Sequence, residues 1–464
     1  MNETAASKYS RQLAELYQRV NYERQSSAGP RSFKLQTMHD LMHRLGHPHQ
    51  ACPVVHVAGT KGKGSVSKMT GEILRHAGMK TGIYSSPHLE RINQRIAVDD
   101  ELITDSQLSA VLDQIQPAIE YLDAEFASRN ERGLTFFEII TAAGFQFFAN
   151  QNADAVVLEV GLGGRLDSTN VCQPAVSIIT NISLDHVKQL GDTITKIATE
   201  KAGIIKPGVP VVSGALHPEA IEVITEIAAD RGAHVFQLDR DMQVHRNDDG
   251  SFSCSGTTRE SFTIEALENN MPGDHQLANA ALAITACRIL IDQGWKISDD
   301  HIRNGILSAT LPGRTEVLSR SPFIMMDMAH NGASVDALMR TFDDEADSGC
   351  RKRFLVATTR EKETAEIVDP LVATADELVL TRYQDNPRGK PIEELAAAVE
   401  ESISRRRDLG QRIPDVKIRE TPELAWQYLA QSLECNDAIC IAGSAFLVAE
   451  LRPSVKKWLA ERCA

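Results

Sequence analysis

Short apolar runs alternate with longer amphipathic stretches along the first half of the chain. The runs are rich in Val and Ile and have the length of strands that are buried in a parallel sheet. They are Val54–Ala58, Thr81–Tyr84, Ala155–Val160, Val176–Thr180 and Val209–Ser213. Helical patterns lie between them, for example at Ser65–Ala77 and Phe136–Ala149. This alternation predicts a doubly wound α/β domain.

The alternation of apolar runs and helical stretches is interrupted in the middle of the chain and then continues. Asp239–Ser261 is polar and predicts a hairpin insert, and Gln276–Gln293 predicts a helix. Leu311–Arg314 contains adjacent Pro and Gly residues, which interrupt regular structure and indicate a hinge. Further strand candidates follow at Phe323–Asp327, Phe354–Ala357, Glu377–Leu380 and Ala438–Ala442. We therefore predict a larger domain over residues 1–310, a hinge at 311–314 and a smaller Rossmann-like α/β domain over 315–464.

Composition and charge limit the classes of binding partner and the cellular compartment that we expect. A chain of 464 residues exceeds the usual size of a single hydrophobic core. The net charge of −14 argues against a general binder of nucleic acid or anionic membranes. The eight cysteines show no CxxC pair and no zinc spacing, so free thiols in a reducing cytoplasm are expected. Because no signal-like or membrane-length apolar run occurs, we expect a cytoplasmic protein.

A glycine-rich segment follows the first apolar run and opens a predicted helix. It reads Gly59-Thr60-Lys61-Gly62-Lys63-Gly64-Ser65. Glycines allow backbone N–H groups to approach phosphate oxygens, and a helix N-terminus favours anions. Lys63 can reach the outer phosphates of ATP, and the Ser65 hydroxyl can hold Mg²⁺. The strict GxxxxGK[ST] pattern is absent because Gly64 separates Lys63 from Ser65, which leaves an ordinary strand–helix turn as the alternative.

Polar residues follow later strand candidates at the edge of the sheet where ligands bind in this class of fold. Glu159 ends an apolar run and could be a Mg²⁺ ligand or a simple capping carboxylate. His186 follows the next run, and the two side chains can converge on one crevice. Lys201 lies near the end of a predicted helix that Gly203 closes, a position where a cation is favourable in any case.

Three motifs resemble a known family. The Gly59–Ser65 segment, the loop Glu159–Asp167 and the Ser85–Leu89 string SSPHL are similar to those of folylpolyglutamate and dihydrofolate synthases, in the Mur ligase superfamily. The extra Gly64 favours the folate branch. The resemblance implies a P-loop ATPase domain, a C-terminal α/β domain, and ATP-dependent ligation of L-glutamate to a folate carboxylate through an acyl phosphate.

The resemblance also implies nucleotide, metal and catalytic residues. The nucleotide-binding residues would be Gly59, Thr60, Lys61, Gly62, Lys63, Gly64, Ser65, Asn279, Arg314 and Asp327. Ser65, Glu159, His186 and Lys201 match positions that bind Mg²⁺, in two sites, one of which would use a carbamylated Lys201. Lys63, His186 and Lys201 would be catalytic.

The substrate side rests on the same resemblance. The residues implied are Ser86, Pro87, His88, Arg95, Phe137, Glu138, His330 and Ser444. Phe136 and Phe137 could stack on a pterin, but two core phenylalanines opening a helix are an equal alternative. The expected partners are folate or dihydropteroate, L-glutamate and ATP, with no nucleic acid or membrane partner, and the protein is expected to be a monomer.

Other functions stay open at this point. A Mur-type cell-wall ligase would share the fold, and a nucleotide-binding protein without ligase activity would share the loop. The presence of Lys63, Glu159, His186 and Lys201 together speaks against a nucleotide-binding protein without ligase activity. A simple P-loop phosphotransferase would leave the second domain unexplained.

Overall fold

The computed structural model describes residues 4–21, 34–360, 364–384 and 386–463. The sequence resemblance to the synthases extends roughly from Phe33 to Arg452, and Phe33 lies outside the described residues. The chain separates into two compact units. The first comprises the described residues up to Asn270 together with His275–Ala309, and the second comprises Met271–Asp274 and the described residues from Thr310 onward. The short segment Met271–Asp274 thus groups with the second unit, although it lies within the stretch predicted as the first domain.

The first unit contains an eight-stranded sheet with the order β4-β3-β2-β5-β1-β6-β7-β8. Its strands are β1 Val54–Ala58, β2 Thr81–Tyr84, β3 Ile96–Val98, β4 Glu101–Leu102, β5 Ala155–Glu159, β6 Val176–Ile179, β7 Val211–Ser213 and β8 Val235–Gln237. Neighbours from β2 to β8 are parallel, and β3 and β4 add an antiparallel edge. The predicted doubly wound sheet is confirmed. Its central strand β1 lies between β5 and β6, which places the glycine-rich loop at the middle of the carboxyl edge.

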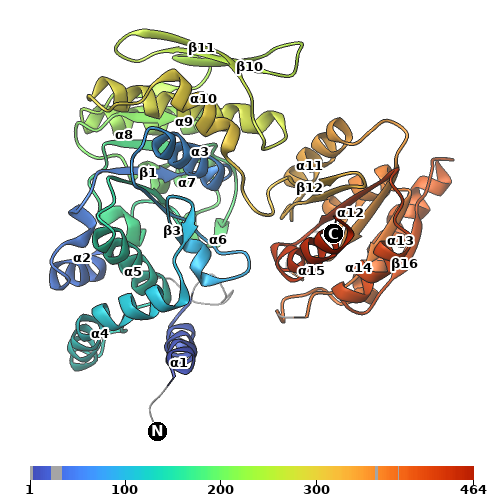
Figure 1. Cartoon of the computed structure of the whole chain (residues 1–464), viewed down its shortest axis with the longest axis horizontal. Helices are drawn as coiled ribbons and strands as arrows, with labels where there is room; N and C mark the ends of the chain where they lie inside the picture. Colours follow the sequence, from blue (N-terminus) through green and yellow to red (C-terminus); the bar gives the residue numbers. More distant parts are fainter. Residues whose placement is uncertain (1–3, 22–33, 361–363, 385, 464) are drawn as a thin grey trace. The chain divides into compact units, whose positions relative to one another are not determined.

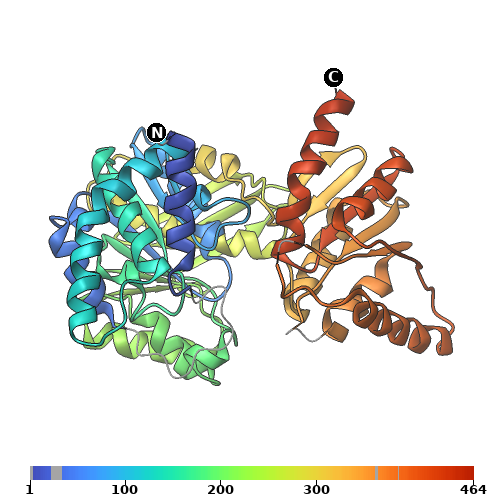
Figure 2. The same cartoon turned by 90° about the horizontal axis from the view of Figure 1, so that it is seen from below.

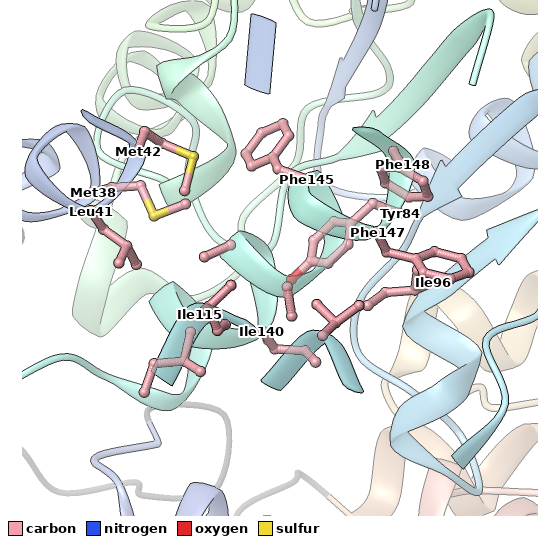
Figure 3. Close-up of a cluster of buried hydrophobic side chains, with 14 of the residues drawn as sticks. Met38, Leu41, Met42, Tyr84, Ile96, Ile115, Ile140, Phe145, Phe147 and Phe148 are labelled. Atoms are coloured by element: carbon pink, nitrogen blue, oxygen red, sulfur yellow. The ribbon is translucent and has the colours of Figure 1, made fainter. Parts of the chain in front are cut away.

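Helices surround this sheet. They are α1 Ala5–Gln18, α2 Leu35–Arg44, α3 Lys63–His76, α4 Asp105–Ser128, α5 Phe136–Asn150, α6 Val187–Leu190, α7 Ile194–Ala202, α8 Pro218–Asp230, α9 Asp274–Asp292 and α10 Asp299–Ser308. Figures 1 and 2 show α1 and α4 beside α5. The nearly all-apolar α5 sits in the largest core, where Tyr84, Ile140 and Phe145 are buried (Figure 3). Burial of each such side chain contributes about 1.5–3 kcal/mol.

The polar insert forms a three-stranded antiparallel sheet. Its strands are β9 Met242–Arg246, β10 Phe252–Thr257 and β11 Ser261–Leu267 (Figure 1). The predicted hairpin ended at Ser261, so the expectation was one strand short. In β11, Phe262 and Ile264 are buried while Ser261 and Thr263 are exposed, which is the period of a half-buried strand.

The second unit is a separate six-stranded sheet with the order β12-β13-β17-β14-β15-β16. The strands are β12 Glu316–Arg320, β13 Phe323–Met326, β14 Arg351–Val356, β15 Glu377–Leu380, β16 Asp415–Ile418 and β17 Asp437–Ala442. The helices are α11 Gly332–Glu345, α12 Thr364–Thr374, α13 Ile392–Asp408, α14 Pro422–Gln431 and α15 Ala445–Cys463. All neighbours except β12 and β13 are parallel, which confirms the predicted Rossmann-like arrangement. In the part of the chain that the structure describes, every helix is too short or too polar to span a bilayer.

Candidate active site

Two glycines of the loop that follows β1 have no room for a side chain. Gly59 has φ +145°, and a Cβ there would lie 1.8 Å from the hydroxyl oxygen of Thr180. Gly62 has φ +92°, and its Cβ would lie 2.4 Å from Oδ1 of Asn279. Both the positive φ values and the close neighbours therefore require glycine. The second contact also brings Asn279, on α9, against the loop, as expected for two parts of one nucleotide site.

The loop is clamped to the segment that follows β6. The backbone N–H of Thr60 donates to the carbonyl oxygen of Asn181 at 2.8 Å, and its hydroxyl donates to the carbonyl oxygen of Ser183 at 3.2 Å. The Thr180 hydroxyl donates to the carbonyl oxygen of Lys61 at 2.7 Å. These bonds hold the backbone in a fixed shape before any ligand binds, which reduces the entropic cost of binding.

Lys63 is the first residue of α3 and lies over the loop. Its ammonium donates to the carbonyl oxygens of Gly59 and Thr60 at 3.2 and 3.4 Å. Ser65 lies one turn into the same helix and is buried. An ammonium and a helix N-terminus at one point form a site for an anion such as a phosphate.

Lys201 is buried at the last turn of α7, with 4% of its surface exposed. Its Nζ donates to the carbonyl oxygen of Gly59 at 2.7 Å. Burial, and next the charge of Lys63, lower the pKa of Lys201 to about 7, against the opposite effect of Asp185 and Asp167. About half of the Lys201 side chains are therefore neutral amines at pH 7, which is the reactive form.

One pocket at this edge collects the predicted catalytic groups. It is lined by Gly59, Thr60, Lys63, Val160, Gly161, Leu162, Gly163, Asp185, His186 and Lys201. His186 adopts a left-handed conformation, φ 49°, immediately before α6. Desolvation lowers the pKa of His186, and Lys63 and Lys201 act in the same direction, whereas Asp185 raises it. The pocket, with a largely neutral His186 ring and several cations around it, therefore suits a polyanionic ligand.

Glu159 ends β5 and is buried at the same edge, one strand away from the loop. Its Oε2 accepts the backbone N–H of Ser86 at 3.3 Å. The Ser86 hydroxyl beside it is buried without a hydrogen-bond partner. Within the described residues, no group of three or more His, Cys, Asp or Glu is arranged to hold a metal. The carboxylate of Glu159 and the hydroxyl of Ser65 are hard oxygen donors of the kind that Mg²⁺ prefers, and Mg²⁺ in such sites also keeps several waters and binds substrate phosphates.

Comparison with known proteins supports the sequence resemblance over nearly the whole chain. Residues 57–287 match the Mur ligase middle domain, and residues 313–445 match the Mur ligase glutamate ligase domain. A dihydrofolate synthase/folylpolyglutamate synthase of Bacillus subtilis is 34% identical over 91% of this chain and 95% of that protein. The folylpolyglutamate synthase of Lacticaseibacillus casei is 33% identical over 89% and 92% of the two chains. The chain belongs to the folylpolyglutamate and dihydrofolate synthase family.

Solved structures of this family have the same fold. The structure of Escherichia coli FolC in complex with DHPP and ADP covers 98% of this chain and 99% of its own, with 28% identity and a TM-score of 0.81. The Mycobacterium tuberculosis folylpolyglutamate synthase complexed with ADP covers 97% and 99%, with 29% identity and a TM-score of 0.82.

The substrate-side residues that the family resemblance implied lie in different surroundings, some beside the pocket and some in the protein core. Arg95 is fully buried, and its Nε donates to Nδ1 of His88 at 2.8 Å, so a neutral His88 carries its proton on Nε2. Phe137 is half-buried and packs against Gly161 of the pocket. Phe136, in contrast, is completely buried and stacks on Tyr17 at 5.5 Å, so the core alternative holds for this residue.

Glu138 has a structural contact that its sequence position also predicts. It is the third residue of α5, and its Oε2 accepts both the backbone N–H and the hydroxyl of Thr135, at 2.8 and 2.6 Å. This reciprocal cap stabilises the start of the helix.

Pro87 is exposed between buried Ser86 and half-buried His88.

The implied residues of the second unit gather at the carboxyl edge of its sheet. Asp327 follows β13 and Ser444 follows the adjacent strand β17. The Asp327 carboxylate accepts the backbone N–H groups of Thr315 at 2.7 Å and Ala329 at 2.6 Å. His330 is half-buried, with Nδ1 2.8 Å from the carbonyl oxygen of Met328. Arg314 lies in the linker immediately before Thr315.

Sequence reasoning missed two residues of the first site. Asp185 lines the pocket and lies 3.7 Å from the ammonium of Lys61. Thr180 forms the wall against Gly59. Asp185 directly precedes His186, so its position beside a predicted ligand was the one available signal. The role of Thr180 depends on strand pairing, which no local pattern shows.

Proposed function

We propose that this protein is an ATP-dependent ligase that joins L-glutamate to the carboxylate of a folate. The observation that carries the proposal is the single pocket that brings the phosphate loop, Lys63, His186 and Lys201 together at the carboxyl end of β1. Amide formation from a carboxylate needs prior activation, because the carboxylate is a poor electrophile at neutral pH. ATP supplies that activation as an acyl phosphate, and glutamate then attacks it through its amine.

The residues of the pocket would act mainly by offsetting the negative charge of the reactants. ATP and the folate carboxylate repel each other, so transfer of the phosphoryl group requires cations around the transferring oxygens. Lys63 lies at the loop and can follow the outer phosphates. Bound Mg²⁺, held by Ser65 and Glu159 with His186 nearby, would neutralise the developing charge. Buried Arg95 would hold His88 in one tautomer toward the folate, and Phe137 would offer a flat face for the pterin.

Lys201 would serve as a carbamate in a second Mg²⁺ site. A neutral amine can form an N–C bond to carbon dioxide and release one proton to water or a nearby base, whereas an ammonium cannot, and the lowered pKa of Lys201 makes the neutral form abundant at pH 7. The product carries a negative oxygen and keeps one N–H, which can still donate to the carbonyl oxygen of Gly59. Carbamylation therefore replaces a buried cation by a metal ligand without breaking the bond at 2.7 Å.

The domain organisation completes the proposal. Residues 1–310 would form the ATP- and folate-binding domain, residues 311–314 the hinge, and residues 315–464 the glutamate-ligase domain, with His330 and Ser444 near the incoming glutamate. We expect the protein to be cytoplasmic and monomeric. Size-exclusion chromatography with light scattering tests the monomeric state directly.

A substrate panel tests the assignment. Purified protein should receive ATP, Mg²⁺ and glutamate with either tetrahydrofolate or dihydropteroate, and ADP release and product mass should be measured. We expect glutamate to be added to tetrahydrofolate. Product with dihydropteroate as well would make the enzyme bifunctional. Product with neither would refute the folate assignment and favour a Mur-type cell-wall ligase, and nucleotide binding without any product would favour a protein that has lost catalysis.

A further inference from the structure

Asp185 places a carboxylate in the pocket where the phosphates of a nucleotide are expected. It lines this pocket together with Lys63, His186 and Lys201, and all four residues belong to the first unit. A negative side chain at this place opposes the binding of a polyanion, because like charges that lie close together repel each other. Asp185 therefore weakens phosphate binding unless another positive charge offsets it.

The Asp185 carboxylate is held in one orientation. Its Oδ1 accepts the backbone N–H of His186 at 2.9 Å, and its Oδ2 lies 3.7 Å from Nζ of Lys61. The Asp185 side chain is 26% exposed, so solvent screens its charge only in part. Oδ2 thus faces the phosphate loop and attracts the ammonium of Lys61.

Lys61 has a fixed backbone and a movable ammonium. Its backbone forms a β-bridge with Asn181, and its carbonyl oxygen accepts the hydroxyl of Thr180 at 2.7 Å. Its side chain is 41% exposed, and the 3.7 Å between its Nζ and the carboxylate is longer than a direct hydrogen bond. Lysine carries its charge at the end of a flexible stem. The ammonium can therefore exchange Asp185 for another anion while the loop backbone stays in place.

Lys63, two residues further along the loop, donates to neutral groups instead. Its ammonium lies 3.2 Å from the carbonyl oxygen of Gly59 and 3.4 Å from that of Thr60. A carbonyl dipole attracts a cation less strongly than a full negative charge does. Lys63 can therefore turn toward a phosphate at little cost, whereas Lys61 must first leave Asp185.

We propose that Asp185 makes nucleotide binding depend on Mg²⁺. Without the metal, the Asp185 carboxylate retains Lys61 and repels the phosphates. When Mg²⁺ accompanies the phosphates, it offsets part of their charge, so the repulsion falls and Lys61 can turn to them. Asp185 is thus a positioning residue for Lys61 that favours the metal-bound nucleotide over the free one. The inference rests on the proposed function only in taking ATP with Mg²⁺ as the ligand.

Calorimetry with the ATP analogue AMPPCP tests this role on the full chain. The dissociation constant is measured in excess Mg²⁺ and in EDTA, at the same pH and ionic strength. Asp185→Asn removes the charge and keeps an oxygen that can accept the N–H of His186. Glu200→Gln is the matched control, because the Glu200 side chain is 25% exposed and pairs with Arg165 at 2.8 Å. Melting temperatures show whether each variant is folded.

In EDTA, Asp185→Asn should bind AMPPCP about tenfold more tightly than the wild type, since one like charge close to the phosphates is removed from a partly exposed site. In excess Mg²⁺ the two proteins should have similar affinities, so Mg²⁺ should strengthen binding severalfold less in the variant. Glu200→Gln should match the wild type in both conditions. In a Lys61→Met background, Asp185→Asn should give a clearly smaller gain in EDTA, because no ammonium is left to release.

Three results would overturn the proposal: equal affinities of the wild type and Asp185→Asn in EDTA, the same gain in Glu200→Gln, or an undiminished gain in the Lys61→Met background. Absence of AMPPCP binding by the wild type in excess Mg²⁺ would refute both this inference and the proposed function. AMPPCP binding without ligation of glutamate to a folate would refute the proposed function alone, so the two failures are distinguishable.

Discussion

The buried ammonium of Lys201 should make stability depend on pH in a predictable direction. Its pKa falls from the ordinary 10.5 to about 7 in the folded protein. Between these values the unfolded chain binds one more proton, so the free energy of unfolding increases with pH. At 1.36 kcal/mol per pK unit, burial of this group costs about 4 kcal/mol at pH 7 and about 2 kcal/mol at pH 9.

Lys201→Met removes the titrating group and keeps most of its volume. The variant also loses the bond to the carbonyl oxygen of Gly59, an offset of about 1 kcal/mol that does not vary with pH. In buffer free of carbon dioxide, the variant should be more stable than the wild type at pH 7. Its advantage should shrink by about 2 kcal/mol at pH 9. Ligation should be abolished in this variant and in Lys201→Ala, and in Lys201→Ala, which leaves space in the site, short carboxylic acids should partly restore it by replacing the carbamate.

Urea unfolding of both proteins at pH 7, 8 and 9 measures this difference. A difference in unfolding free energy that stays constant over the three pH values would refute the reasoning, since Lys201 would then titrate normally. Bicarbonate with Mg²⁺ should stabilise the wild type and leave Lys201→Met unchanged. A carbamate signal in carbon-13 NMR with labelled bicarbonate, absent from the variant, would identify the modified group.

Three other perturbations test separate parts of the structure. Lys63→Ala should abolish ADP release. The circular dichroism spectrum should stay unchanged, because the Lys63 side chain bonds only to carbonyl oxygens of the loop. Normal turnover by the variant would exclude Lys63 from the mechanism. Gly62→Ala should weaken AMPPCP binding more than tenfold, since a Cβ would meet the Asn279 side chain at 2.4 Å, and unchanged calorimetry would show that the loop adapts. Arg353→Ala should cost about 3–5 kcal/mol in urea unfolding, because it removes the buried guanidinium that pairs with the carboxylates of Glu377 at 2.7 Å and Asp437 at 3.3 Å, with the KM for ATP unchanged; a loss below 1 kcal/mol would contradict this.

Local pattern alone was enough for the central strands of both sheets and for the phosphate loop. The Val- and Ile-rich run Val54–Ala58 forms β1 with the predicted bounds, because a buried parallel strand needs only a short apolar stretch. The glycines after it predicted a tight turn, and Gly59 and Gly62 have the positive φ values that such a turn requires. The polar insert shows the limit of this approach, since the predicted hairpin stopped at Ser261, where the third strand, β11, begins.

Tertiary structure decided what these elements do together. Nothing around Lys201 in the sequence predicts a pKa near 7, because the shift comes from burial and from Lys63, which is distant in the chain. Phe136 and Phe137 are equivalent as sequence, yet one is in the core and the other borders the pocket, since successive residues on a helix face different directions. The bond from Thr315 to Pro272 joins two segments that no periodicity relates. The sequence by itself therefore determined the central strands, the loop and the family, while desolvation and contacts between distant residues determined the charge state and positions of the groups in the site.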